Sequence, residues 1–186
     1  MRFTGLALAA FISAVLAKPT PYYDDYPLKA VVVLTNDSQN VTGTVTFTQA
    51  YRNGGTEVYA KIKGLVSGTK HGMHVHETGD LSGGCETLGL HFNPFNQDHG
   101  SPTSKVRHVA DFGNIEEYDD DWATLKLDIP SLRLDGRNSI IGRGLVLHSG
   151  EDDLGLGDSP LSKTVGNSGA RLACGIVGIA AWGKDN

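Results

Sequence analysis

Apolar and polar residues alternate with a period of two along much of this chain, and the alternation leaves few folds open to it. It is clearest in three segments, TGTVTFTQA (42–50), TEVYAKIKG (56–64) and WATLKLDIP (122–130). Successive side chains of a β-strand point to opposite faces, so these segments predict strands with one buried face. Further apolar runs occupy 28–34, 140–148 and 173–182, and no segment has helical periodicity. The sequence predicts an all-β fold, a sandwich or barrel with Greek-key connections.

Two long segments lack this alternation. The first runs from Thr78 to Asn114 and the second from Ser149 to Arg171, and both are rich in glycine. Loops of this length inside a compact domain are normally functional or disordered. The first segment carries histidines, which favours function.

The ends of the chain differ from its centre. Residues 1–17 combine Arg2, an apolar run and small residues before a cleavage position after Ala17, which predicts a secretory signal; an uncleaved anchor is the alternative. Residues 18–27 are rich in proline and aspartate and predict a loose arm. Residues 28–186 then form a single domain.

Charge and sequons limit the partners. The net charge is −5 and there is no cluster of lysine and arginine, which argues against nucleic acid and anionic membranes as partners. The tail WGKDN is neither hydrophobic nor strongly basic, so no membrane anchor is expected. Asn36 and Asn40 begin sequons and are candidate glycosylation sites behind a secretory signal.

All seven histidines lie between positions 71 and 148, and three of them fall within HGMHVH (71–76). Residues i and i+2 of a strand share a face roughly 6 to 7 Å apart, so His74 and His76 can converge on one metal ion. The other candidate ligands follow along the chain: His91, His99, His108, Asp111 and His148. Three histidines with an aspartate suit a tetrahedral zinc ion, and histidines alone suit copper. The alternative is a set of core histidines, each satisfied by a hydrogen bond.

The two cysteines, Cys85 and Cys174, favour a disulfide in an oxidising compartment. Closing a loop of that length contributes about 4.6 kcal/mol at most in the chain-entropy view. Two separate buried thiols are the alternative.

Several blocks of the sequence resemble, in order and spacing, the copper/zinc superoxide dismutases. They are GLVSGTKHGMHVHETGD, GCETLGLHFNP, HGSPTSKVRHVADFGN, SIIGRGLVLHSGEDDLG and GNSGARLACGIVGIA. The resemblance covers about residues 28 to 181. It implies an immunoglobulin-like Greek-key β-sandwich, or flattened eight-stranded barrel, with two long functional loops.

The resemblance also implies a role for each candidate residue. The copper ligands would be His74, His76, His91 and His148. The zinc ligands would be His91, which bridges the two metals, His99, His108 and Asp111. Outside this set, Asp152 would link His74 to His99, and His71 would be a framework histidine near the copper loop. Cys85 and Cys174 would form the disulfide, and Arg171 would be the active-site arginine.

The implied activity is conversion of superoxide to oxygen and hydrogen peroxide, with Arg171 and His91 as catalytic residues and one copper and one zinc per chain. A secreted, extracellular enzyme of antioxidant defence is expected, which receives copper in the secretory pathway and forms a homodimer. A non-catalytic metal-binding module and a copper-only dismutase are the alternatives. Leu90, Val165 and Lys163 depart from the common family pattern, and these departures concern the rate more than the identity.

Overall fold

The computed structural model describes residues 26–36, 40–118 and 121–181. The predicted signal (1–17), the arm up to residue 25 and the tail after Ala181 lie outside these residues. Of the two candidate glycosylation sites, Asn40 is exposed in the turn after the first strand, and only the backbone of Asn36 is described. No helix among the described residues has the length and apolar character needed to cross a membrane.

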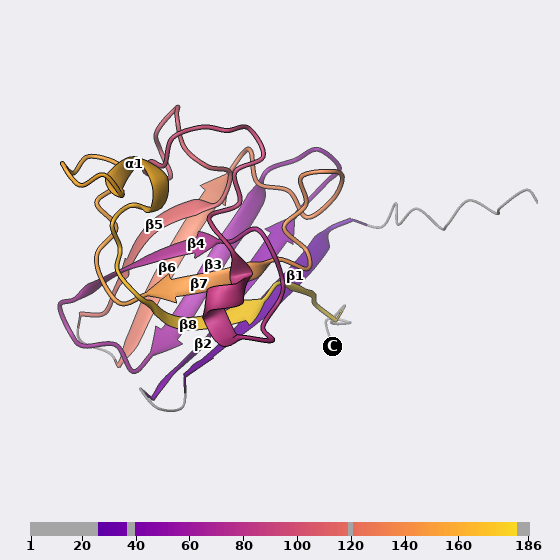
Figure 1. Cartoon of the computed structure of the whole chain (residues 1–186). Coiled ribbons are helices and arrows are strands. Elements are labelled where there is room, and N and C mark those ends of the chain that lie inside the picture. The colour runs from indigo at the N-terminus through magenta and orange to yellow at the C-terminus, as the bar shows by residue number, and fades with distance from the viewer. Residues whose placement is uncertain (1–25, 37–39, 119–120, 182–186) are drawn as a thin grey trace, which may run out of the picture.

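Antiparallel strands form a nearly closed barrel, which confirms the predicted all-β fold (Figure 1). The described strands are β1 (Leu28–Asn36), β2 (Val41–Gln49), β3 (Thr56–Lys63), β4 (Lys70–Val75), β5 (Asp111–Glu116), β6 (Trp122–Ile129), β7 (Gly144–His148), β8 (Arg171–Ile176) and β9 (Gly178–Ile179). Their order around the barrel is β5-β4-β7-β8-β1-β2-β3-β6, and β9 pairs with β1. Two short helices, η2 (Gly84–Leu88) and α1 (Ser162–Val165), lie in the connections.

The alternating segments form strands as predicted. In β2 and β3 every second side chain is buried, and Val45 lies opposite Val32 of β1 and Ala60 of β3 in the register. β6 continues this side of the barrel by pairing with the full length of β3. A shift of one residue would turn each apolar face to solvent, so the alternation fixes the register.

Three predicted boundaries are wrong. The first irregular segment ends at Ala110, because β5 begins at Asp111 rather than after Asn114. Only residues 144–148 of the apolar run 140–148 form a strand, since residues 140–143 turn before it. The run predicted at 173–182 contains the end of β8, up to Ile176, and the short strand β9 at Gly178–Ile179. Apolar runs without alternation give no signal of where a strand starts.

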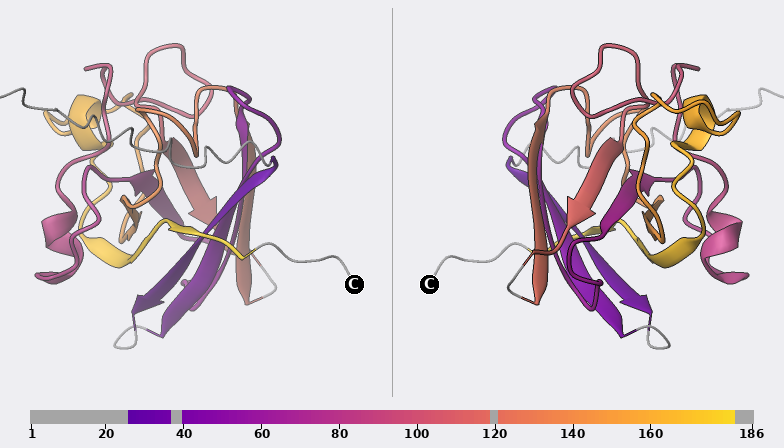
Figure 2. Two further views of the ribbon diagram at one scale, coloured as in Figure 1. Left: turned by 90° about the vertical axis from the view of Figure 1, so that its right-hand side faces the viewer. Right: turned by 90° about the vertical axis from the view of Figure 1, so that its left-hand side faces the viewer.

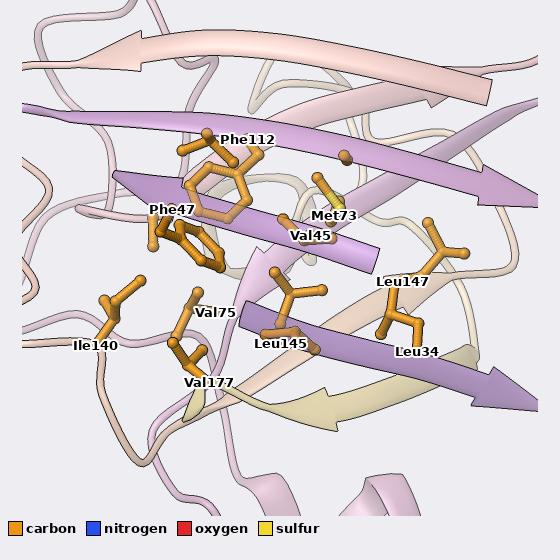
Figure 3. Close-up of a cluster of buried hydrophobic side chains, with 14 of the residues drawn as sticks. Leu34, Val45, Phe47, Met73, Val75, Phe112, Ile140, Leu145, Leu147 and Val177 are labelled. Carbon is orange, nitrogen blue, oxygen red and sulfur yellow. The ribbon is translucent and has the colours of Figure 1, made fainter. Parts of the chain in front are cut away.

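The core fills the barrel (Figure 3). Phe47 from β2 and Phe112 from β5 approach with ring centroids 6.1 Å apart, so the two sides of the barrel meet there. Met73 and Val75 of β4 point into the same core, at 0% and 1% exposure. The intervening residue of β4, His74, must therefore point outward.

The outer face of β4 and β7 is also covered. Every residue of β7 is buried, and so are the residues of β4 after Lys70. The connections 76–110 and 149–170 cover this face, and their helices η2 and α1 lie on the same side of the barrel (Figure 2). Register shifts interrupt β4 next to His74 and β7 next to His148. Such bulges often lie beside active sites, where they redirect side chains.

Candidate metal centre

The ends of two neighbouring strands hold the first group of histidines. His74 lies on β4 opposite Val146 of β7, and His148 is the last residue of β7. His76 follows β4 directly and forms an isolated β-bridge with His91, which belongs to the long connection. The strands and this bridge bring four imidazoles from three segments onto the outer face of the barrel.

These four histidines form a tight, dry cluster. One nitrogen from each of His74, His76, His91 and His148 lies within 4.8 Å of the others. The four residues are between 0% and 4% exposed. The rings of His74 and His91 have centroids 4.0 Å apart. The grouping predicted from the sequence is therefore present.

In three of these rings, one nitrogen is bonded and the other is not. His74 Nε2 donates to Asp152 Oδ2 at 2.7 Å, His76 Nδ1 to the Gly89 carbonyl at 2.9 Å, and His148 Nδ1 to the Gly169 carbonyl at 3.2 Å. The second nitrogen of each ring, like both nitrogens of His91, is buried without a hydrogen-bond partner.

An unsatisfied buried polar atom costs about 1–3 kcal/mol, so this arrangement calls for a ligand. Because the bonded nitrogen carries the proton, the other carries a lone pair. Four converging imidazole lone pairs fit a copper ion.

Asp111 gathers a second group of imidazoles. Its carboxylate lies 3.3 Å from His91 Nδ1, 2.9 Å from His99 Nδ1 and 3.2 Å from His108 Nδ1. Although these atoms are close, the Nδ1 atoms of His91 and His99 make no hydrogen bond. Three imidazoles and one carboxylate are a donor set for tetrahedral zinc.

Two details complete this second group. The four residues whose donor atoms all lie within 4.8 Å of one another are His74, His91, His99 and Asp111. His108 joins them through its 3.2 Å contact with Asp111, and its Nε2 lies 3.1 Å from the Gln97 carbonyl. His91 belongs to both groups, so its two unpaired nitrogens suit a ligand shared between two ions.

Asp152 connects the two groups from behind. Its Oδ2 accepts from His74 Nε2 at 2.7 Å and its Oδ1 from His99 Nε2 at 2.8 Å, and the residue is 1% exposed. Burial opposes its ionisation, but the hydrogen bonds from His74 and His99 hold the pKa of the carboxyl below its usual range. A carboxylate behind a histidine ligand fixes its tautomer and ring orientation.

Burial is the main reason why three imidazoles of the first group have low pKa values. Burial, with a smaller contribution from the neighbouring His91, lowers the pKa of His74 to about 3, of His76 to about 2 and of His148 to about 4. The positive charge of Arg171 contributes to the low pKa at His76 and His148. These rings are neutral at neutral pH, as metal ligands must be.

In the second group, nearby carboxylates have the opposite effect and raise the pKa of an imidazole. Burial lowers the pKa of His99, but the close carboxylates of Asp111, 2.9 Å from Nδ1, and Asp152, 2.8 Å from Nε2, outweigh it and raise the pKa to about 9. Burial likewise opposes ionisation of Asp111, and the imidazoles of His108, His91 and His99 hold its carboxyl pKa well below the usual range. The ionised carboxylates thus stabilise positive charge on this group, as a cation site requires.

The other predicted residues lie around this centre. His71 Nδ1 donates to the His148 carbonyl at 2.9 Å, and its Nε2 lies 2.9 Å from Thr69 Oγ1. Arg171 opens β8 and donates to carbonyls of η2 and of Gly89. Cys85 of η2 and Cys174 of β8 form a disulfide, which excludes two separate thiols.

The sequence did not single out two residues that support the centre. Asn114 accepts from the Asp152 backbone N–H at 2.7 Å and donates to the Asp152 carbonyl at 2.9 Å. Gly166 ends α1 with φ +66, and a Cβ there would lie 2.6 Å from His99 Nε2. The only sequence signal for either residue is its place in a block that resembles the family, and that signal does not separate it from its neighbours.

Comparison with known proteins identifies the family. The profile of copper/zinc superoxide dismutases (SODC) matches residues 41–177, which is most of the chain. The chain belongs to the copper/zinc superoxide dismutase family. A Cu-Zn superoxide dismutase of Botryotinia fuckeliana is 46% identical over 154 residues, which is 83% of this chain and 99% of that protein. One of Yarrowia lipolytica is 47% identical over the same shares.

Solved structures agree with this membership. The crystal structure described as that of the clock protein EA4 superposes with a TM-score of 0.77 and 44% identity, over 83% of this chain and 96% of that one. A Cu/Zn superoxide dismutase carries one copper and one zinc per chain, and the two histidine groups supply a donor set for each. The predicted enzyme class, cofactors and superoxide substrate are therefore confirmed.

Proposed function

We propose that this chain is an extracellular superoxide dismutase in which one shared imidazole joins the two metal sites. His74, His76, His91 and His148 would hold copper. His91, His99, His108 and Asp111 would hold zinc. The observation that carries these assignments is the set of buried, unpaired imidazole nitrogens in two overlapping groups, of which only His91 has both ring nitrogens unpaired among the described residues.

Bound copper would supply one-electron chemistry, by which one superoxide is oxidised to oxygen and a second is reduced to hydrogen peroxide. The chain's own residues orient the metal ligands, supply a proton and control the approach of superoxide. Asp152 holds His74 and His99 at fixed orientations through two short hydrogen bonds. His91 belongs to both groups, and a proton held on its ring would lie beside the copper ligands, where it can be passed to the reduced product.

Access of the anionic substrate depends on Arg171. The net charge of −5 repels anions, so attraction must come from a local positive charge. The charge of Arg171 affects the pKa of both His76 and His148, so it acts at the first group. The side chain is 14% exposed, which weakens screening by solvent.

Superoxide decay followed by pulse radiolysis tests the activity on protein loaded with one copper and one zinc per chain. Near-diffusional decay supports the proposal, and decay no faster than buffer with both metals bound contradicts it. Arg171→Ala is expected to slow decay by about 10-fold and to weaken its ionic-strength dependence, because a steered encounter loses its attracting charge. Its copper content should stay unchanged, and unaltered kinetics would refute the role of Arg171.

Secretion rests on separate observations. The apolar leader at 1–17, the disulfide and the two sequons at Asn36 and Asn40 all suit the secretory pathway, in which the chain would receive copper. Expression in a eukaryotic host should release protein that begins near Lys18 and whose mass decreases on treatment with glycosidase.

The exposed Val33 and Ile179 on the paired strands β1 and β9 support a homodimer, which sedimentation would detect.

A further inference from the structure

The guanidinium of Arg171 is held by the short helix η2. Its Nη1 donates to the Cys85 carbonyl and to the Glu86 carbonyl, and its Nη2 donates to the Gly89 carbonyl. These bonds fix the plane of the group. They add no negative charge, because all three acceptors are backbone carbonyls.

A full negative charge nevertheless lies beside this arginine. Glu86 Oε2 is 3.7 Å from Arg171 Nε, which is within ion-pair distance but longer than a hydrogen bond. The Glu86 side chain is 77% exposed and that of Arg171 is 14% exposed. Among the described residues, this is the one ion pair that Arg171 makes.

We propose that Glu86 determines how strongly this enzyme attracts small anions, because its carboxylate offsets the positive charge of Arg171. The proposal rests on the role of Arg171 proposed above. Superoxide approaching the guanidinium also approaches Glu86, so attraction and repulsion partly cancel. Glu86 thus lowers the rate of encounter and the affinity for other monovalent anions, and acts through Arg171 rather than on the substrate itself.

The disulfide keeps this carboxylate in place. Cys85, the neighbour of Glu86, is bonded to Cys174, which lies on the same strand as Arg171. Gly84, which precedes Cys85, has φ +76, a conformation that glycine adopts without strain. The helix η2 cannot move away from β8 while the disulfide is intact. Only the rotamers of Glu86 remain free, so its negative charge stays near the guanidinium.

The expected effect is moderate because the carboxylate is exposed. A unit charge about 6 Å from an approaching anion, screened by bulk water, changes the encounter rate about 3-fold. The Debye length is about 30 Å at 0.01 M salt and about 8 Å at 0.15 M, so the effect should shrink as salt is added.

The test compares Glu86→Gln, Glu86→Asp and Glu57→Gln with the wild type, all as copper- and zinc-loaded protein. Glu86→Gln should raise kcat/KM for superoxide by about 3-fold at low ionic strength and steepen its fall with salt. Glu86→Asp keeps the charge and should behave like the wild type. Glu57→Gln changes the net charge by the same amount, but Glu57 lies on β3, where it pairs with Lys126. This variant should therefore have little effect on kcat/KM.

Azide affinity gives a readout that does not depend on turnover. Azide is a monovalent anion, and its binding can be titrated by the visible absorption of the copper site. Glu86→Gln should tighten azide binding by a similar factor of about 3 at low salt, with no change in copper content or thermal stability beyond that of Glu57→Gln.

The outcomes separate this inference from the proposed function. If Arg171→Ala slows decay but Glu86→Gln matches Glu57→Gln in both rate and azide affinity, the offset by Glu86 is refuted and the role of Arg171 stands. If Arg171→Ala leaves decay unchanged, the proposed guidance by Arg171 fails, and the inference fails with it. Faster decay in both Glu86→Gln and Glu57→Gln would also overturn it, since net charge alone would then explain the gain.

Discussion

At the scale of single residues, the metal centre depends on which nitrogen of each imidazole is already bonded. In the first group the protein bonds Nε2 of His74 but Nδ1 of His76 and His148, so each ring presents its other nitrogen to the cluster. Backbone carbonyls hold two of these rings, and a carboxylate holds the third. The carboxylate is the stronger partner, because a hydrogen bond to a charged group is roughly twice as strong as one between neutral groups.

Asp152→Asn tests this partner with little change in size. An amide offers only one oxygen, so it can accept from His74 or from His99 but not well from both, and its negative charge is lost. Zinc and copper affinity should fall by about 10- to 100-fold, as expected when a group behind a metal ligand is removed. Competition with a chelator measures this, with Asp128→Asn on the exposed face of β6 as control. Equal affinities in the two variants would contradict the role of Asp152.

Residue types, spacing and the family resemblance were enough to predict the candidate ligands and Asp152 behind them, but not Asn114 or Glu86. His74 and His76 share a strand face, and the other ligands are of metal-binding type, so chemistry and resemblance together indicated them. Asn114 acts through backbone atoms of Asp152, 38 positions away in the chain. Glu86 lies beside Arg171, 85 positions away in the chain, where a disulfide and the hydrogen bonds of Arg171 join η2 to β8. Contacts made through the fold leave no local pattern in the sequence.

At the scale of elements, how well the sequence predicts a strand depends on how many of its faces are buried. β2, β3 and β6 bury one face or most of it, so they alternate, and their predicted ranges differ from the observed ones by one or two residues at most. β7 is buried on both faces, and the first three residues of β5 are all buried, so neither strand shows alternation. Burial under the two long connections, which keeps water from the site, therefore also obscured where these strands begin.

The end of α1 gives a test at this scale. Gly166 has φ +66, and a Cβ there would overlap Asp152 Oδ1 and His99 Nε2. Gly166→Ala should cost at least about 2 kcal/mol of unfolding free energy, because strain and overlap add. It should also release zinc. Gly136→Ala is the matched control, since Gly136 has φ +70 and nothing within 4 Å of the added Cβ.

The control should lose only about 1 kcal/mol, the cost of the left-handed conformation, and keep its zinc. Thermal unfolding and metal analysis of the two variants measure both effects. Equal destabilisation with zinc retained in each would show that Gly166 is needed for its backbone conformation alone and not for its position against Asp152.

At the scale of the whole molecule, the barrel and the metal centre place opposite demands on the same residues. A stable barrel buries the outer face of β4 and β7, and that burial isolates imidazole nitrogens from water. Without metal, these atoms are a cost to the fold. Bound copper and zinc would satisfy them, so metal binding and folding stability are coupled.

The pH dependence of the metal-free protein follows from this coupling. The pKa values of His74, His76 and His148 are lowered to about 3, about 2 and about 4, chiefly by burial. Between pH 6.5 and 4 the unfolded chain therefore binds protons at these positions that the folded chain does not. Stability is fully present above pH 6.5 and falls below it, with a limiting slope of roughly 1.4 kcal/mol per pH unit for each imidazole.

His99 acts in the opposite sense, because its pKa is raised to about 9 by Asp111 and Asp152. Its contribution is complete below pH 6.5 and is lost as the pH rises through 9, so it does not offset the acid loss. Metal-free protein should thus be most stable near neutral pH, and its unfolding midpoint should drop steeply from pH 6.5 to 5. His76→Gln removes one titrating group and should make this drop shallower. A midpoint that stays flat over this range in metal-free wild type would show that water reaches these imidazoles and that the centre is not dry.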